Sequence, residues 1–265
     1  MELTIALVNY NSSVLVANIL HCLSRLTKNH CKVLICDSSN KFMERLIIKK
    51  ISNVFPIENI ETIETYFKTF PEKGSAGHGA ALNFLIDRID TQYGAIFDAD
   101  CPPLMKGWDQ ILIDMLDDHV KIAGTSAVET QFRTTTFPLM FACLFDAATF
   151  KSLGIDMRPG DISKGQDTGW EMEQKFLDAG YGGRILEGKS TRKYTDGPFG
   201  EIVGCDEYYY GGKIFCCHLG RGSNRAYVIH KDTGLPLVLC KRKAMKQTRR
   251  WMEICREIVG DEGKI

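Results

Sequence analysis

The stretch GAIFDAD at residues 94–100 decides the fold class of this chain. Its apolar first half predicts a short buried strand, and the carboxylates of Asp98 and Asp100 follow that strand directly. In an open parallel sheet, ligands bind beyond the carboxyl ends of the strands, so acidic residues placed there are candidates for function. Two carboxylates two residues apart can bind a divalent cation and leave other positions open for phosphate and water. We therefore predict an α/β fold with a metal site at this strand end, the alternative being an Asp-x-Asp in a solvated turn.

Outward from this stretch, short apolar runs alternate with helical patterns, which is typical of parallel βαβ units. The strands predicted in the first half cover residues 3–9, 32–37, 60–66 and 94–98, and the helices cover residues 14–26, 41–51 and 76–89. The second of these strands also ends on an acid, Asp37. In the second half we predict a strand at 137–145, a helix at 168–179, a glycine- and tyrosine-rich stretch at 182–212, a loop after residue 218 and a basic helix from about 242 to 259.

Length, charge and cysteine content disfavour several classes of protein. A chain of 265 residues can bury a large core, and an α/β fold of this length is often one domain with two functional halves. Lys plus Arg and Asp plus Glu each number 33, so nucleic acid is disfavoured as the main ligand. The ten cysteines lack a Cys-x-x-Cys pair, which favours reduced thiols and a cytoplasmic location. The apolar run at residues 3–8 is too short for a signal peptide or a membrane span.

Four segments in the first hundred residues carry a family resemblance. They are LTIALVNYNS at 3–12, ICDSSN at 35–40, the turn and helix from Gly77 to Asn83, and FDAD at 97–100. Their order and spacing resemble those of the family-two glycosyltransferases. The resemblance implies a GT-A type α/β fold, which is a Rossmann-like, mostly parallel sheet flanked by helices. It also implies an enzyme that transfers a sugar from a nucleotide-diphosphate sugar to an acceptor hydroxyl.

The same resemblance implies roles for individual residues. Asp37 would contact the base or ribose of the donor, and Asp98 and Asp100 would contact its ribose and its metal-bound diphosphate. The family usually carries two acids after the second strand, whereas this chain has Cys36 followed by Asp37. The other donor-binding residues implied by the matching segments are Asn9, Asn11, Gly77, His78, Asn83 and Ala99.

His218 resembles the late histidine that many enzymes of this fold use as a further metal ligand. A neutral imidazole beside the carboxylates of Asp98 and Asp100 suits Mn²⁺ better than Mg²⁺, so we expect Mn²⁺. In the glycine-bearing segment that follows, Arg221 and Ser223 offer hydrogen-bond donors to the diphosphate. An ordinary histidine followed by a solvated loop would show the same pattern.

An inverting transfer needs one carboxylate within hydrogen-bond reach of the acceptor hydroxyl. Family members often place that base in an acidic pair at the start of a helix with a Gly-Tyr end, and Gly180-Tyr181 supplies such an end here. Gln166 stands where a glutamate is common, so we assign the base to Asp167, with Glu171 as the substitute. A helix N-cap is the alternative role for Asp167.

We expect one catalytic domain across residues 1–265. Residues 1–128 would bind the nucleotide sugar and the metal, residues 129–240 would bind the acceptor, and residues 241–265 would form the basic helix. Because this helix combines six basic residues in ten positions with apolar residues, residues 241–259 could lie on an anionic membrane. Such contact would suit a transferase that builds polysaccharide on a glycan or lipid-linked glycan. A helix packed on the domain with a solvated basic face is the alternative.

Three other functions compete with this prediction. GRILEGKS at 183–190 satisfies the P-loop pattern, but a predicted helix precedes it and its apolar pair falls inside the supposed loop, so an NTPase is disfavoured. A sugar-phosphate nucleotidyltransferase would use the same carboxylate and metal chemistry but would release pyrophosphate. A non-catalytic nucleotide-sugar binding protein would turn over no donor.

Overall fold

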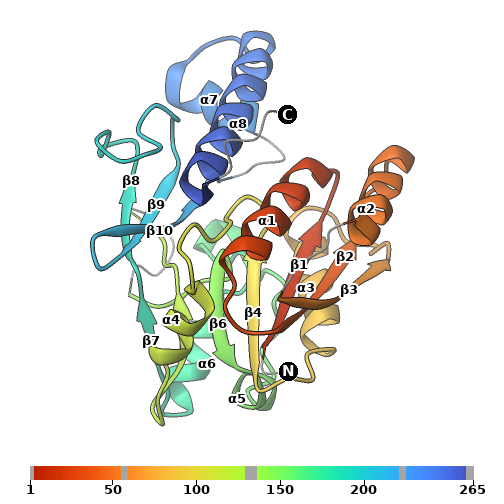
Figure 1. The fold of residues 1–265 in the computed structure, drawn as a ribbon, viewed down its shortest axis with the longest axis vertical. Helices are drawn as coiled ribbons and strands as arrows, with labels where there is room; N and C mark the ends of the chain where they lie inside the picture. Colours follow the sequence, from red (N-terminus) through yellow and green to blue (C-terminus); the bar gives the residue numbers. More distant parts are fainter. Residues whose placement is uncertain (1–2, 55–58, 129–135, 221–224, 261–265) are drawn as a thin grey trace.

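A seven-stranded sheet forms the centre of the molecule (Figure 1). The computed structural model describes residues 3–54, 59–128, 136–220 and 225–260, and its strand order is β3-β2-β1-β4-β6-β5-β7. The strands are β1 (Leu3–Asn9), β2 (Cys31–Asp37), β3 (Ile60–Phe67), β4 (Tyr93–Asp98), β5 (Val120–Gly124), β6 (Ala142–Asp146) and β7 (Gly182–Ile185). Neighbouring strands are parallel except at β6, which runs antiparallel to both β4 and β5. The prediction of a mostly parallel sheet is confirmed.

Helices flank this sheet, with α1 and α2 on its near side in Figure 1 and α3 and α6 behind it. Their bounds are α1 (Ser13–Leu26), α2 (Phe42–Val54), α3 (Ser75–Ile86), α4 (Trp108–Asp114), α5 (Ala147–Ser152) and α6 (Met172–Asp178), with a short 3-10 helix at Ile162–Lys164. In α1 the apolar residues recur at helical spacing, and the buried ones are Leu15, Val16, Ile19, Leu20 and Leu23. Burial of this face fixes α1 against the sheet.

The polar residues that end neighbouring strands meet at one edge of the sheet. Every residue of β1 is buried, which is typical of a central parallel strand covered on both faces. In the strand register, Asn9 of β1 pairs with Asp37 of β2, and Val8 pairs with Asp98 of β4. Parallel strands therefore bring Asn9, Asp37 and Asp98 to the same end of the sheet.

A second, three-stranded antiparallel sheet lies beside this edge, in the order β10-β9-β8. Its strands are β8 (Glu187–Ser190), β9 (Asp206–Tyr210) and β10 (Lys213–His218). An isolated bridge joins Pro103 to Cys216, and Leu104 N donates a hydrogen bond of 2.7 Å to Phe215 O. These contacts hold β10 against the chain that leaves β4.

Two helices complete the described chain, α7 (Arg225–Thr233) and α8 (Leu237–Val259). The inner end of α8 packs on the body of the molecule, where Trp251, Ile254 and Cys255 are buried. Figure 1 shows the rest of the α7–α8 pair standing away from the central sheet. We expected a loop between His218 and the basic helix, and the structure instead forms α7 there.

The elements predicted in the first half are confirmed, and two further predictions in the second half are corrected. The expected strand at 137–145 is a strand only at Ala142–Asp146, because Pro138 has no N–H to donate to a ladder. The expected helix at 168–179 begins at Met172, because Gly169 has a φ of 73°, which a helix does not allow. The main sheet takes strands from both sides of residue 128, so both expected halves share it.

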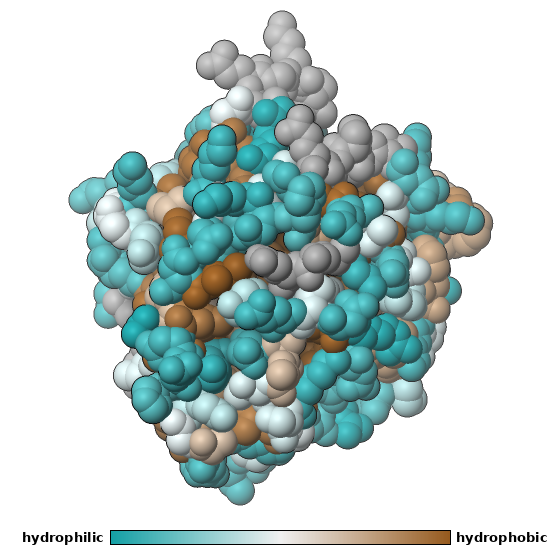
Figure 2. All heavy atoms as spheres, turned by 60° about the horizontal axis from the view of Figure 1, so that its bottom comes forward, coloured by the Kyte–Doolittle hydropathy of each residue, from teal (hydrophilic) through white to brown (hydrophobic). Residues whose placement is uncertain are grey.

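The molecular surface is mainly polar on the face that Figure 2 presents, where hydrophobic residues form small patches among hydrophilic ones. Among the described helices, none is both long enough and apolar enough to cross a membrane.

The P-loop interpretation fails on structure as well, because Gly183 to Ser190 falls on β7 and β8 and opens no helix.

Candidate metal and catalytic site

Three side chains that can bind a metal converge at the carboxyl end of β4. The ligating atoms of Asp98, Asp100 and His218 all lie within 4.8 Å of one another. His218 Nε2 is 3.6 Å from Asp100 Oδ1 and 3.9 Å from Asp98 Oδ2. The exposed fraction is 17% for the Asp98 side chain and 11% for each of the other two. The cluster is therefore largely shielded from water.

Backbone hydrogen bonds hold this cluster together. Cys101 N donates to Asp98 O at 2.9 Å and closes the turn that carries Asp100. Leu219 N, next in the chain after His218, donates to Asp100 O at 2.9 Å. The imidazole of His218 also stacks on Phe141, with ring centroids 4.4 Å apart and planes inclined by 28°. The backbone next to His218 is thus held by the hydrogen bond from Leu219, and its imidazole is held by the stacking on Phe141.

The cluster carries an excess of negative charge. Burial lowers the pKa of His218, but the carboxylates of Asp100 and Asp98 outweigh this effect and raise the pKa to about 9. Asp98 Oδ1 is buried and accepts no hydrogen bond from any described residue. A divalent cation would satisfy both features, because it neutralises carboxylates and takes a carboxylate oxygen as a ligand. Two carboxylates and one imidazole therefore make a donor set that fits such an ion.

His78 places a second imidazole beside Asp98. It lies in the first turn of α3, and its Nε2 is 3.3 Å from Asp98 Oδ1, an ion-pair distance without hydrogen-bond alignment. Burial lowers the pKa of His78, but the carboxylates of Asp98, Asp100 and Asp167 raise it above its ordinary value. Asp167 is therefore near enough to interact electrostatically with His78.

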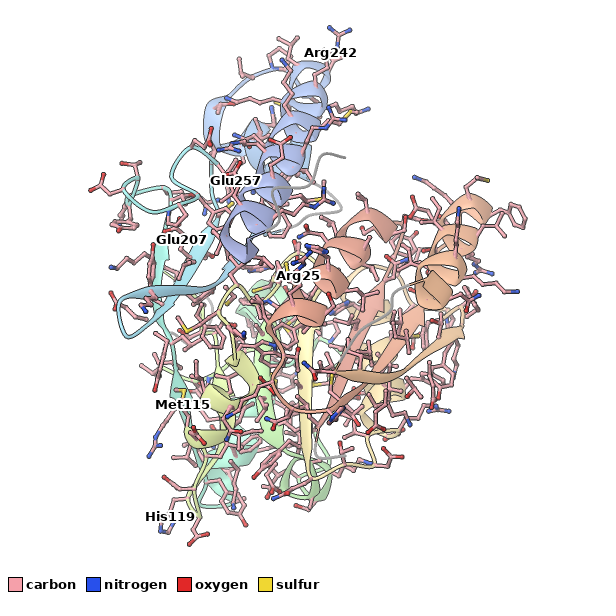
Figure 3. The ribbon with its side chains drawn as sticks, viewed as in Figure 1. Arg25, Met115, His119, Glu207, Arg242 and Glu257 are labelled. Atoms are coloured by element: carbon pink, nitrogen blue, oxygen red, sulfur yellow. The ribbon has the colours of Figure 1, made fainter. Side chains whose placement is uncertain are left out.

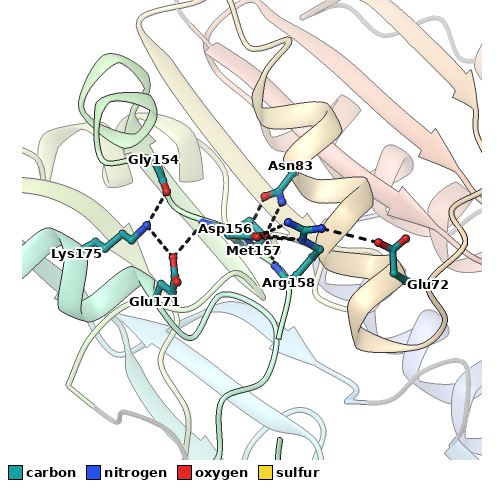
Figure 4. Close-up of polar contacts among 8 residues, drawn as sticks. All are labelled: Glu72, Asn83, Gly154, Asp156, Met157, Arg158, Glu171 and Lys175. Carbon is teal, nitrogen blue, oxygen red and sulfur yellow. Dashed lines mark hydrogen bonds and ion pairs between the residues drawn. The ribbon is translucent and has the colours of Figure 1, made fainter. Parts of the chain in front are cut away.

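The structure distinguishes the two candidate bases by their partners. Glu171 Oε2 accepts hydrogen bonds from Lys175 Nζ at 2.8 Å and from Asp156 N at 3.2 Å (Figure 4). Lys175 Nζ in turn donates to Gly154 O at 2.6 Å. The Glu171 carboxylate thus ties the loop after α5 to the start of α6.

Asp167 lies in the loop before α6 and not at its N-cap, because the helix begins five residues later. Its Oδ1 accepts a hydrogen bond of 2.8 Å from Thr168 N. Thr168 Oγ1 donates to Ser75 O at 3.2 Å, which ties this loop to the start of α3. The loop that carries Asp167 therefore lies against the start of α3, the helix that carries His78.

Two residues expected to bind the donor have partners within the fold. Asn83 Nδ2 donates to Asp156 Oδ1 at 2.7 Å, and Asn83 Oδ1 accepts from Met157 N at 2.9 Å (Figure 4). A side chain at Gly77 would place its Cβ 2.7 Å from Glu72 O, so close backbone packing explains this glycine. Asn83 thus holds the loop at residues 156–157 against α3, and Gly77 allows the backbone at Glu72 to pack closely on the same helix.

Three further residues expected to bind the donor, Asn9, Asn11 and Asp37, have hydrogen-bond partners within the fold. Asn9 Nδ2 donates to Asp37 Oδ1 at 3.0 Å, and Asn11 Nδ2 donates to Asn40 Oδ1 at 2.8 Å. Asp37 is fully buried, and its Oδ2 has no hydrogen-bond partner among the described residues. A nucleotide therefore reaches the Asp37 carboxylate only if neighbouring side chains move.

The remaining predicted residues are placed as follows. Ala99 occupies the turn between the two carboxylates and packs against the core. Arg221 and Ser223 lie outside the described residues. Sequence reasoning missed two neighbours of His218, the stacked ring of Phe141 and the carboxylate of Asp206, its cross-strand partner. Only the pairing of β9 with β10 brings Asp206 to this position.

The sequence model of glycosyl transferase family 2 matches residues 4–178 of this chain. The chain belongs to glycosyl transferase family 2. The matched segment of this transferase contains Asp98, Asp100, Asp167 and Glu171, whereas His218 lies beyond it. No curated protein matches the sequence of the transferase.

Several solved structures are similar to this family 2 transferase. The mannosyltransferase PcManGT from Pyrobaculum calidifontis, solved with GDP-Man and Mn²⁺, has 12% identity and a TM-score of 0.55, over 100% of this chain and 76% of that chain. TarS 1-349 from S. aureus has 14% identity and a TM-score of 0.48, over 70% of this chain and 58% of that chain. The same TarS fragment with UDP-GlcNAc has 13% identity and a TM-score of 0.48, over 97% and 74%. The first likeness supports the GT-A fold.

Proposed function

We propose that this family 2 transferase moves a sugar from a nucleotide-diphosphate sugar to an acceptor hydroxyl with the help of a divalent cation. The observation that carries the proposal is the convergence of Asp98, Asp100 and His218 within 4.8 Å. A cation at these residues would supply Lewis-acid stabilisation to the departing nucleoside diphosphate. We propose Mn²⁺ in preference to Mg²⁺, because imidazole is a poor ligand for Mg²⁺.

We propose direct displacement with inversion, and Asp167 as the general base. Its carboxylate interacts with His78 beside the cluster, whereas the Glu171 carboxylate is bound to Lys175 and to Asp156 N. Asp167 would take the proton of the acceptor hydroxyl while the hydroxyl oxygen bonds to the anomeric carbon. The bond from that carbon to the diphosphate breaks on the opposite face.

The donor and the acceptor are proposed by class. Asn9, Asn11 and Asp37 would lie on the nucleotide side, because Asn9 and Asp37 end β1 and β2 next to β4 and Asn11 follows β1 by two residues. We propose a glycan or lipid-linked glycan as acceptor, in polysaccharide synthesis. The transferase would then work in the cytoplasm in peripheral contact with a membrane.

A ligand screen with product analysis tests this function. We expect one of UDP, GDP, CDP or dTDP to raise the melting temperature when Mn²⁺ is present and not in its absence, since a ligand that binds only the native state stabilises it. With the matching nucleotide sugar, the enzyme should release nucleoside diphosphate. Release of pyrophosphate would instead identify a nucleotidyltransferase. Binding without turnover of any donor, with acceptor glycans present, would leave a nucleotide-sugar binding protein.

A further inference from the structure

The outer end of the α7–α8 pair exposes apolar side chains to solvent. Every residue from Thr233 to Leu239 is exposed, and the exposed fractions of Leu237, Val238 and Leu239 are 49%, 71% and 52%. Met245, two helical turns beyond Val238, is 75% exposed. Burial on the opposite face of α8 starts only at Cys240, which together with Ala244 of the same helix packs on Ile229 of α7. Among the described residues, none buries these four apolar side chains.

Basic residues surround these apolar side chains without any acidic residue among them. From Gly234 to Met252 the sequence contains no Asp or Glu. The basic residues in this interval are Lys241, Arg242, Lys243, Lys246, Arg249 and Arg250. At helical spacing, Val238, Lys241, Arg242, Met245 and Arg249 share one face. We call residues 235–249 the outer segment of the pair.

The inner half of α8 has a different character. Arg250 is paired with Glu201 at 2.7 Å and with Glu257 at 2.8 Å. Trp251, packed beside it, is fully buried. The sequence suggested a membrane-facing helix over 241–259, but the structure commits residues from Arg250 onward to contacts within the molecule. Within the described length of α8, the outer segment is the part that leaves apolar and basic side chains exposed.

Position also suits the outer segment for docking. Figure 3 shows Arg242 at the far end of α8 and Glu257 nearer the body of the molecule. The base of the pair is tied to the candidate site, because the Arg225 guanidinium donates to Leu219 O at 2.7 Å and to Gly204 O at 3.3 Å. Leu219 directly follows His218. The base of the α7–α8 pair is therefore fixed to the chain next to the metal-binding cluster.

We propose that the outer segment docks the protein on an anionic lipid bilayer. Exposed apolar side chains can enter the boundary of the acyl chains while neighbouring Lys and Arg side chains contact anionic head groups. A nucleic acid would use the basic residues but would leave Val238 and Met245 in water. The proposal deepens the proposed function, since a bilayer is where a lipid-linked acceptor resides, and it is measured without any transfer reaction.

Sedimentation of the full chain with vesicles tests the proposal. We expect binding to phosphatidylcholine vesicles that contain phosphatidylglycerol, little binding to phosphatidylcholine alone, and weaker binding as salt screens the charges. Lys241→Glu with Arg242→Glu should lower partitioning roughly 25-fold or more, since each basic residue near an anionic surface contributes about fivefold. Val238→Ser with Met245→Ser should also weaken binding without a change of charge. The matched control is Lys106→Glu with Lys213→Glu, two exposed lysines outside α7 and α8.

Three results would overturn the proposal. The first is equal binding by the charge variant and its control, or no binding by the native chain. The second is equal binding of the native chain to neutral and anionic vesicles. The third is concentration-dependent self-association that Val238→Ser with Met245→Ser abolishes, because the apolar stripe would then be an interface between copies. Vesicle binding by a protein that transfers no sugar would leave docking intact and reject only the proposed function.

Discussion

His78 Nε2 lies 3.3 Å from Asp98 Oδ1, although the two residues come from the start of α3 and the end of β4. The contact joins the helix that follows the glycine-rich turn to the strand that carries the carboxylates. A side chain that holds a metal ligand in place influences metal affinity even when it is not itself a ligand. The contact between His78 and Asp98 therefore brings together the two segments of the sequence on which the family resemblance most depends.

Replacement of His78 tests this arrangement. His78→Ala should weaken the apparent affinity for Mn²⁺ by roughly 10- to 100-fold, which is the usual effect of losing a residue that orients a metal ligand. The measurement is a titration of Mn²⁺ monitored by calorimetry, with circular dichroism to check the fold. An unchanged affinity in a folded variant would show that His78 and Asp98 are neighbours without a functional link.

Removal of the metal or of a ligand should stop the transfer. We expect full loss of activity in excess EDTA, recovery on addition of Mn²⁺, and loss in Asp100→Asn. The variant should stay folded, because it removes one of two neighbouring negative charges, Asp98 and Asp100, that repel each other in the metal-free protein. Activity assays with and without chelator check this prediction, and undiminished transfer in EDTA would refute the metal assignment.

The two candidate bases should differ in kind when they are replaced. Asp167→Asn should preserve donor affinity and lower turnover by roughly two to four orders of magnitude, the usual share of a general base. Glu171→Gln should lower the free energy of unfolding by about 1 kcal/mol, since it weakens the contacts with Lys175 and Asp156 N, and should leave turnover near the native value. Steady-state kinetics and chemical denaturation separate the effects. The reverse pattern would move the base to Glu171.

Lowering the pH should reduce the stability that Asp156 contributes to the loop packed on α3. The Arg158 side chain holds the pKa of Asp156 well below its ordinary value. A lowered pKa stabilises the folded state above about pH 4, the value for an unfolded aspartate, and this contribution is lost as the pH falls through the folded pKa.

The partly exposed Asp156 should contribute no more than about 1 kcal/mol, because solvent screens the pair. Asp156→Asn should therefore be less stable than the native protein at pH 7, and the difference should shrink below pH 4. Denaturation at both pH values provides the measurement. A difference that stays constant with pH would mean that the hydrogen bond from Asn83, and not charge, carries the contribution.

The sequence determined the first four strands of the sheet and the acids at the ends of two of them. Strands and helices in the first half follow from local apolar periodicity, which reports which face of an element is buried. Parallel strands end at the same edge, so the sequence alone groups Asp37 with Asp98, and the register of β1 adds Asn9 to them. Glycines and prolines disturbed the same reasoning later in the chain, as Pro138 and Gly169 show.

Only the tertiary structure decided which distant side chains join that edge. His218 reaches Asp100 because β10 pairs with β9 and is bridged to Pro103, and such long-range pairing leaves no periodic signal in the sequence. The partners of Asp167 and Glu171 likewise depend on the fold, because residues four apart share the same local pattern and differ in what the fold brings to them. The tertiary structure also divides the continuous basic helix α8 into two parts. Its inner half packs on the body of the molecule, whereas its outer half packs on α7 with one face and exposes the opposite face.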